Sequence, residues 1–236
     1  MSLSKVLEIA KLELGVTENP PGSNNVKYNT AYYGKPVSGS AYPWCVVLQW
    51  WIFQEAGERM SFFGGGRTAS CRTLLRWYRE QGLTADKQAT QVGDIWILNF
   101  SGKKVNGELD TEHCGLVVEK GPLAGTWYCI EGNTSPGEEG SQDNGGCVAL
   151  KLRSVRNVVG VCRPQYKPEE TEIIDDVTGH WAQTEIRWAK DNELVKGFPD
   201  GSFKPNQGVT RAEICVILFR FFKLILRLIR GEDDLK

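Results

Sequence analysis

The stretch PWCVVLQWWIF, residues 43–53, predicts both a buried helix and a reactive side chain. Gln49 is the single polar interruption in its apolar run, which indicates a helix buried on nearly all sides. Pro43 suits the first turn of such a helix, because the N–H that proline lacks would have no partner there. The thiol of Cys45 would then lie at the positive end of the helix dipole, which favours the nucleophilic thiolate.

A thiolate nucleophile requires a base, and the chain contains two histidines, His113 and His180. His113 lies in EHCGLVV, residues 112–118, which predicts the start of a strand. Farther on, YCIEGNT, residues 128–134, predicts a second strand that runs into a turn. His180 instead precedes a predicted helix, and we interpret it as a structural residue.

Cys45, His113 and a polar residue on the second strand supply the parts of a cysteine-dependent hydrolytic site. The imidazole takes the thiol proton, and a partner, Glu131 or Asn133, fixes the orientation of the ring. Taken alone, Cys45 would more often be a small buried hydrophobe, and His113 a satisfied, partly buried histidine. The segments around these residues shift the balance toward catalysis.

Four segments resemble, in the order in which they occur along the chain, those of a CHAP domain. CHAP domains are a family of cysteine- and histidine-dependent amidohydrolases and peptidases that cut peptidoglycan. The resemblance covers roughly residues 4–165, and the closing GVCRP fits it as well. It implies an α+β, papain-like fold with helices packed on an antiparallel sheet. The four segments are Pro43–Cys45, Val92–Ile97, Glu112–Val117 and Ile130–Thr134.

The same resemblance implies a role for each residue of the site. Cys45 would be the nucleophile, His113 the general base and later the general acid, and Glu131 the residue that orients His113. Asn133 would be a further polar residue of the site. The bond cleaved would be the one that an N-acetylmuramoyl-L-alanine amidase or a peptidoglycan endopeptidase cuts.

The rest of this region fits helices on a sheet. Apolar spacing predicts helices over residues 3–14 and 69–81. A polar, glycine-rich loop is expected over 132–146, where it could rim a cleft. Short strands are expected near 94–100, 114–119, 126–131, 147–152 and 157–162.

No metal or cofactor is expected. Residues 19–33, where some CHAP domains carry a calcium loop, contain no Asp or Glu, so Asn24, Asn25 and Asn29 are expected to line a loop or contact substrate. The seven cysteines show no CxxC spacing, which argues against a zinc site. Their odd number argues against a complete disulfide framework and favours buried free thiols in a reducing cytosol.

A polar segment with two prolines, residues 166–172, is expected to be a linker between a catalytic domain (1–165) and a second domain (173–236). The second domain contains DDVTGHWA (175–182), GFPDGSFKP (197–205) and TRAE (210–213). TRAE is a capping box, in which Thr210 and Glu213 each bond the other's backbone. Together these motifs resemble one surface-layer homology (SLH) repeat, a small all-α module.

The SLH resemblance implies binding to an anionic secondary polysaccharide of the cell wall. Arg211 would contact the acidic group of the polymer, because the guanidinium fork suits a carboxylate. Trp181 would support a sugar ring, although a core role is at least as well supported. SLH repeats usually occur in threes, and a single copy leaves three alternatives open: a homo-oligomer such as a trimer, packing on the catalytic domain, or weak monomeric binding.

The C-terminal segment, residues 214–230, is strongly apolar, but charges at 220, 223, 227 and 230 fall on one helical face. These charges interrupt it too often for a membrane span. Our first interpretation is an SLH helix extended into a domain interface, and the second is a helix that forms the oligomer. A cationic helix that contacts membrane ranks third.

A net charge of −1 gives no electrostatic reason to expect a nucleic-acid partner. The N-terminus, MSLSKVLE, lacks the apolar core of a signal peptide, so we expect synthesis in the bacterial cytoplasm and holin-dependent release, as for a bacteriophage endolysin. The alternatives are a secreted autolysin or wall-remodelling enzyme, and a catalytically inactive protein anchored to the wall. A purely structural surface-layer role ranks last.

Overall fold

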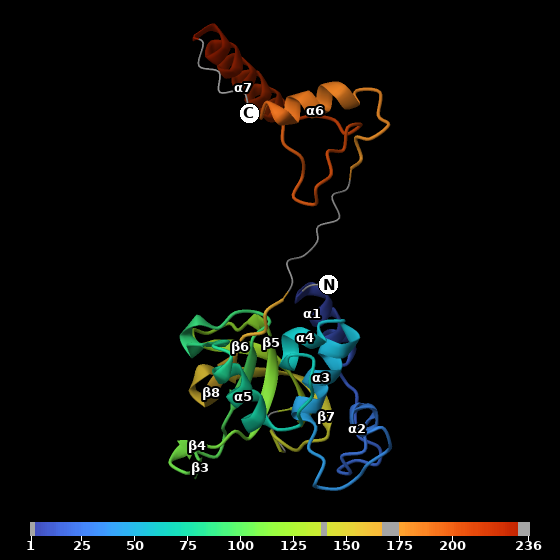
Figure 1. Ribbon diagram of the computed structural model, residues 1–236, viewed down its shortest axis with the longest axis vertical. Coiled ribbons are helices and arrows are strands. Elements are labelled where there is room, and N and C mark those ends of the chain that lie inside the picture. Colours follow the sequence, from blue (N-terminus) through green and yellow to red (C-terminus); the bar gives the residue numbers. More distant parts are fainter. Residues whose placement is uncertain (1–2, 138–140, 167–174, 231–236) are drawn as a thin grey trace. The chain divides into compact units, whose positions relative to one another are not determined.

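The computed structural model describes residues 3–137, 141–166 and 175–230 (Figure 1). The chain divides into two compact units, Met1–Glu169 and Glu170–Lys236. Of the expected linker, Tyr166 alone is described; 167–172 lie outside the described residues, as do 173, 174 and 231–236 of the expected second domain. Tyr166 belongs to the first unit, because its ring stacks on Phe53 and its hydroxyl donates to the Gly93 carbonyl at 2.6 Å.

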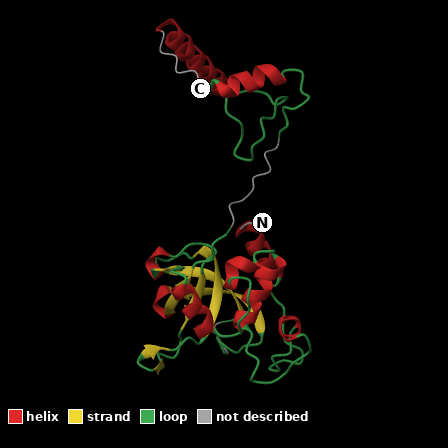
Figure 2. Ribbon diagram, in the orientation of Figure 1, coloured by secondary structure: helices red, strands yellow, loops and turns green. Residues whose placement is uncertain are grey.

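The first unit is built on a six-stranded antiparallel sheet, which confirms the predicted combination of helices with an antiparallel sheet (Figure 2). Its order is β1-β8-β2-β5-β6-β7, so β5 and β6 are neighbouring interior strands and β7 is an edge. A separate hairpin pairs β3 (Lys104–Val105) with β4 (Glu108–Leu109). The six strands are β1 (Thr84–Ala85), β2 (Ile95–Leu98), β5 (His113–Lys120), β6 (Thr126–Thr134), β7 (Cys147–Ser154) and β8 (Val158–Cys162).

Helices cover this sheet, with α3 packed against β5 and β6 and α5 against β8 (Figure 1). Ser70 caps α5 by accepting a hydrogen bond from the Thr73 amide. The short helices α2 and α4 were not predicted, since five to seven residues give too few turns for an apolar period to be recognised. The helices of this unit are α1 (Leu3–Leu12), α2 (Lys27–Tyr33), α3 (Cys45–Glu55), α4 (Arg59–Phe63) and α5 (Cys71–Glu80).

Helix α3 is the buried helix that its apolar sequence predicts. Val46, Leu48 and Phe53 are fully buried in the main core. The prediction that Pro43 lies in its first turn is wrong, because Trp44 is the N-cap residue and Cys45 is the first helical residue. Pro43 therefore precedes the cap, and the thiol is carried on the first residue of the helix.

Strand β6 is longer than predicted and includes the first residues of the expected 132–146 loop. It continues to Thr134, which pairs with Cys147 after an irregularity in the register beyond Glu131. Gly132 makes this path possible: a Cβ there would lie 2.7 Å from the Trp44 ring and 2.8 Å from a Leu48 methyl. The strand thus passes directly against the first turns of α3.

The asparagines of the 19–33 segment hold a loop together. The Asn24 amide donates to the Gly39 carbonyl at 3.1 Å, and the Asn29 amide donates to the Tyr42 carbonyl at 3.0 Å. Asn29 is fully buried. These side chains satisfy backbone acceptors ahead of α3, as expected of loop-lining residues.

The second unit contains two described helices, α6 (Gln183–Asp191) and α7 (Arg211–Arg230). The predicted capping box is confirmed: Thr210 Oγ1 accepts from the Glu213 amide at 3.2 Å, and Glu213 accepts from the Thr210 amide at 2.7 Å. Asp176 ties the start of the unit to its middle by accepting hydrogen bonds from two amides, those of Phe203 and Lys204.

Helix α7 leaves most of its apolar side chains exposed, including Leu218, Phe219 and Phe222. Arg220, one of the four charges on that face, donates from its guanidinium to the Leu194 carbonyl at 3.2 Å and so holds the segment after α6. Within the described ranges no helix has the combined length and apolar character that a bilayer span requires. Self-association through α7 stays a prediction.

Candidate active site

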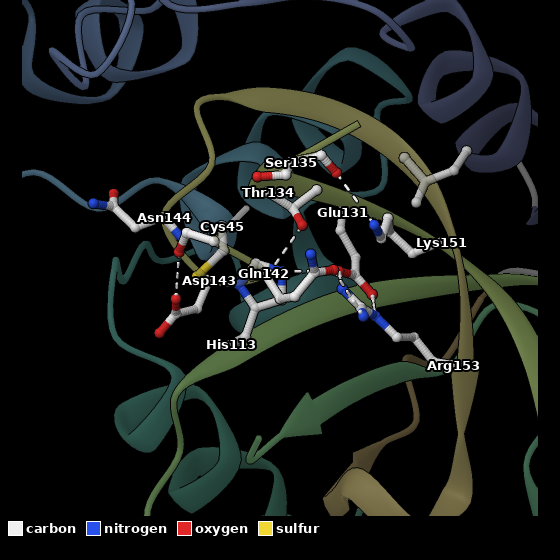
Figure 3. A network of polar contacts seen from close by, with 12 residues as sticks. Cys45, His113, Glu131, Thr134, Ser135, Gln142, Asp143, Asn144, Lys151 and Arg153 are labelled. Atoms are coloured by element: carbon white, nitrogen blue, oxygen red, sulfur yellow. Dashed lines mark hydrogen bonds and ion pairs between the residues drawn. The ribbon is translucent and has the colours of Figure 1, made fainter. Parts of the chain in front are cut away.

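The N-terminus of α3 and the neighbouring strands β5 and β6 bring three of the predicted residues together (Figure 3). Cys45 begins α3, His113 begins β5, and Glu131 lies on β6. The His113 Nε2 atom lies 3.1 Å from Glu131 Oε2, and both side chains are fully buried. Of the two candidates for orienting the imidazole, Glu131 is therefore the one that contacts it.

Arg153, which sequence reasoning missed, holds Glu131 from its other side. Its Nε donates to Glu131 Oε1 at 2.7 Å and its Nη2 donates to Oε2 at 2.6 Å. A bidentate guanidinium–carboxylate pair fixes both position and orientation. Arg153 also donates to Gln142 Oε1 at 3.2 Å. Figure 3 shows Cys45 near His113, with His113 joined to Glu131 and Glu131 joined to Arg153.

The charges and hydrogen bonds around His113 favour the protonated, positively charged form of its imidazole. Burial alone would raise the pKa of Glu131, but hydrogen bonds from Arg153 and His113 outweigh it and hold that pKa below the ordinary value. Burial likewise opposes a charge on His113, yet its interactions with Cys45 and Glu131 raise its pKa to about 9. His113 is therefore protonated at neutral pH when Cys45 is ionised.

The thiols of Cys71 and Cys114 lie beside that of Cys45. Its Sγ lies 3.8 Å from Cys71 Sγ, and the sulfurs of Cys45, Cys71 and Cys114 all lie within 4.8 Å of one another. Hydrogen bonds from Cys114 and Cys71 lower the pKa of Cys45 well below its ordinary value, and His113 adds to this effect against the opposing effect of burial. The pKa of Cys114 is raised, first by burial and then by the same hydrogen bonds. These opposite shifts favour ionisation of Cys45 over that of Cys114.

Asn133 is buried but is not joined to His113. Its backbone has a left-handed φ of 60°, and its carbonyl accepts from the Gly145 amide at 2.8 Å. Both polar atoms of its side-chain amide are buried without a hydrogen-bond partner. A buried amide left unpaired in this way retains its full capacity to bind another group.

Gly115 makes room for Glu131, and we predict that Gly115→Ala disturbs the site. A Cβ at this position would lie 2.7 Å from Glu131 Cγ, so the carboxylate would have to move away from His113. Overpacking of this kind costs about 1–3 kcal/mol of unfolding free energy. Urea denaturation measures that cost, with Gly208→Ala as control because nothing lies within 4 Å of a Cβ there. Unchanged stability would contradict the packing argument.

The lowered pKa of Cys45 predicts an unusual pH dependence of alkylation. A free cysteine, with a pKa of about 8.5, loses reactivity roughly tenfold per unit as pH falls below that value. Cys45 is expected to react with iodoacetamide at a nearly constant rate between about pH 6 and 8, because it stays ionised beside protonated His113. In chelator-treated protein, peptide mass spectrometry measures the alkylation rate of Cys45 separately from that of the other cysteines. A rate that titrates like that of added glutathione would refute this prediction.

The predicted polymer-binding residues of the second unit are both accessible. Arg211 is the exposed first residue of α7, and Trp181 is 89% exposed, which excludes the core role considered for it. Among the described residues no hydrogen bond or ring contact joins the two. His180 has structural contacts, since its Nδ1 accepts from the Ala182 amide at 3.2 Å. A separate hollow is lined by Phe198, Phe203, Lys204, Val216, Arg220 and their neighbours.

Comparison with known proteins places the second unit in a family. Residues 173–215 match the family model of the SLH (S-layer homology) domain. The chain is 41% identical over 54 residues to cell surface glycoprotein 1 of Acetivibrio thermocellus, covering 23% of this chain and 2% of that protein. It is 33% identical over 54 residues to the cellulosome-anchoring protein of the same organism, covering 23% of this chain and 12% of that protein.

Two more distant likenesses complete the comparison. Outer membrane protein SlpA of Thermus thermophilus is 29% identical over 65 residues, covering 28% of this chain and 6% of that protein. The crystal structure of wild-type endolysin LysIME-EF1 aligns over 71% of this chain and 66% of that chain, with 19% identity and a TM-score of 0.42. The chain thus spans a small fraction of its curated relatives, and residues 173–215 are an S-layer homology domain.

Proposed function

We propose that the first unit is a CHAP-type, papain-like cysteine hydrolase that cleaves an amide bond of peptidoglycan, and that the SLH unit binds it to the wall. The observation that supports the chemistry is the row Cys45, His113, Glu131 and Arg153, with a 3.1 Å contact between imidazole and carboxylate. A thiolate, an imidazolium and an anchored carboxylate are the groups that acyl transfer requires.

In the proposed reaction the Cys45 thiolate attacks the carbonyl carbon of the scissile amide. Protonated His113 gives its proton to the leaving nitrogen as the C–N bond breaks, which leaves an acyl-thioester on Cys45. Neutral His113 then takes a proton from water, and the resulting hydroxide attacks the thioester and releases the acid. The free amides in the first turn of α3 are candidate donors to the oxyanion.

Glu131 acts through the imidazole and not on the substrate. Its contact with Nε2 leaves His113 Nδ1 as the nitrogen available to Cys45. The carboxylate also stabilises the imidazolium, and Arg153 keeps the carboxylate ionised despite its burial. This assignment makes His113 the catalytic acid and base, and makes Glu131 and Arg153 positioning residues.

Digestion of purified peptidoglycan tests this function. Wild type and Cys45→Ala are incubated with walls of several peptide chemotypes, and the soluble products are identified by mass spectrometry. Release of fragments by wild type alone supports the proposal. A new muramic-acid terminus identifies an amidase, and a new peptide terminus an endopeptidase. If wild type releases nothing from any chemotype, the hydrolase proposal fails.

Wall binding is tested separately with Cys45→Ala protein, which leaves the walls intact. We propose that Arg211 binds an acidic group of a wall polysaccharide, since SLH-bearing relatives include a protein named for anchoring. Loss of a charge-assisted hydrogen bond costs about 1.5–3 kcal/mol, so Arg211→Ala is expected to weaken co-sedimentation with walls by at least about tenfold. Arg227→Ala, on the same helix, is the control. Equal binding by the two variants would refute the role of Arg211.

A further inference from the structure

Three thiols from three separate elements converge beside the imidazole of His113. Cys45 begins α3, Cys71 begins α5, and Cys114 follows His113 on β5. All three side chains are buried, and their sulfurs lie within 4.8 Å of one another. The proposed reaction uses one of these thiols as nucleophile, and leaves the presence of the other two unexplained.

The spacing of the sulfurs fits tetrahedral thiolate coordination. Zn–S bonds of about 2.3 Å at tetrahedral angles place neighbouring sulfurs roughly 3.8 Å apart. Cys45 Sγ and Cys71 Sγ already lie 3.8 Å apart. The upper limit of 4.8 Å for the remaining pairs exceeds the ideal separation by about 1 Å, which small side-chain rotations can close.

The surroundings offer a fourth ligand. Nδ1 of His113 is buried without a hydrogen-bond partner, while Nε2 of the same ring contacts Glu131. A carboxylate behind the distal nitrogen is the usual outer-shell arrangement of a metal-binding histidine. His113 lies outside the set of mutually close ligand atoms, so its ring must shift to take this position; otherwise a water molecule fills it.

We propose that Cys45, Cys71 and Cys114 form a binding site for a thiophilic divalent cation of the Zn²⁺ class. Three sulfur–metal bonds form, the thiol protons leave to solvent, and no electron is transferred. Thiolate ligands select such ions over Mg²⁺ or Ca²⁺. We expected no zinc site because the cysteines show no CxxC spacing. That absence excludes only a site whose ligands are close together in the sequence.

The cluster is specific to these three residues. Cys129 and Cys162 are equally buried, yet within the described ranges they join no group of three potential ligands. Cys147 Sγ instead donates to the Thr134 carbonyl at 2.8 Å. Burial of cysteine therefore does not by itself produce the arrangement, and Cys129 provides a matched buried control.

Metal binding would switch off the proposed hydrolase, and this consequence rests on the proposed function. A sulfur–metal bond occupies the lone pair with which Cys45 would attack a carbonyl. Zn²⁺ is expected to inhibit wall cleavage in direct proportion to its occupancy, and a chelator is expected to restore it. The ion-binding site itself is tested without substrate.

The experiment titrates full-length, chelator-treated protein with Cd²⁺ under anaerobic conditions and a phosphine reductant, while the ultraviolet sulfur-to-metal band is recorded. Zn²⁺ bound after gel filtration is counted by mass spectrometry. Wild type is expected to bind one ion per chain. Outer-shell changes alone cost 10–100-fold in affinity, so Cys71→Ala and Cys114→Ala are each expected to lose at least about 100-fold. Cys129→Ala and exposed Cys215→Ser should bind like wild type.

A second measurement requires no variant. Zn²⁺ should protect Cys45 of wild type from iodoacetamide, as read by peptide mass spectrometry, while Cys215 remains reactive. Absence of the ultraviolet band, or unprotected Cys45 at saturating Zn²⁺, would overturn the proposal. Protein that cleaves walls but binds no ion refutes this inference alone. Protein that binds the ion yet cleaves no wall after chelation refutes the hydrolase alone.

Discussion

The His113→Gln variant is expected to cleave peptidoglycan about 10³-fold more slowly than wild type, because it loses both the proton acceptor and the proton donor of the reaction. Glutamine occupies similar space and retains a polar contact for Glu131, but it carries no titratable proton. Loss of the imidazolium also removes one of the influences that lower the pKa of Cys45. The variant should therefore show slower alkylation of Cys45 at neutral pH as well as slower cleavage.

His180→Gln is the matched control for this experiment. His180 is the second histidine of the chain and contacts Asn206 and the Ala182 amide in the SLH unit. Its substitution should leave the cleavage rate of soluble peptidoglycan fragments unchanged. Comparable loss in both variants, or full activity in His113→Gln, would exclude His113 as the acid and base.

The Arg153→Met variant is expected to lose about 3–5 kcal/mol of unfolding free energy. Methionine fills similar volume, but it leaves the buried Glu131 carboxylate with His113 as its remaining charged partner, and removing one partner of a buried ion pair is strongly destabilising. The pKa of Glu131 should rise in consequence, so the loss is greatest at neutral pH and shrinks as the pH falls and the carboxyl becomes protonated. Urea unfolding at two pH values measures both effects.

Two further variants separate the charge from the packing. Arg156→Met changes an exposed arginine close by in the sequence and should leave the unfolding free energy nearly unchanged. The double variant Glu131→Gln with Arg153→Met removes both charges and is expected to recover much of the lost stability. A double variant as unstable as Arg153→Met would show that packing, and not the unpaired carboxylate, causes the loss.

The fold of the first unit is largely predictable because its main signals are long apolar runs. The 43–53 stretch predicts a buried helix, and the runs around 95–98 and 114–118 predict strands. Cys45, His113 and Glu131 could be named because each lies in a sequence motif, and the motifs occur in a recognisable order along the chain. Their actual contacts depend on how the strands pair, which the sequence leaves open.

Arg153 could not be found in this way because β7 reverses the ordinary pattern. Leu150 and Leu152 are exposed, whereas Lys151 and Arg153 between them are buried. An alternating strand is normally interpreted with its leucines inward and its charges in solvent. Here the inward positions are polar because Glu131 and the Ser135 carbonyl need partners, which Arg153 and Lys151 provide. A tertiary requirement overrides the local pattern.

Cys71 and Cys114 were missed as neighbours of Cys45 for a different reason. Sequence arguments about cysteine clusters depend on short spacings, and these three thiols come from two helix starts and one strand. Only the packing of α3 and α5 on the sheet brings them together. The same limitation applies to Gly115, whose need for a small side chain depends on Glu131 across the strand pair.

The reversed alternation of β7 also bears on solubility. The strand forms an edge of the sheet, and among the described residues, residues 15–17 pair with its first part, through Thr17, Cys147 and Val148. Beyond that point its outer backbone groups and two exposed leucines could recruit a strand from another molecule. Inward-pointing charges are a known deterrent to such aggregation. Lys151 and Arg153, beyond holding the site together, would therefore help keep this edge from joining its neighbours at high concentration.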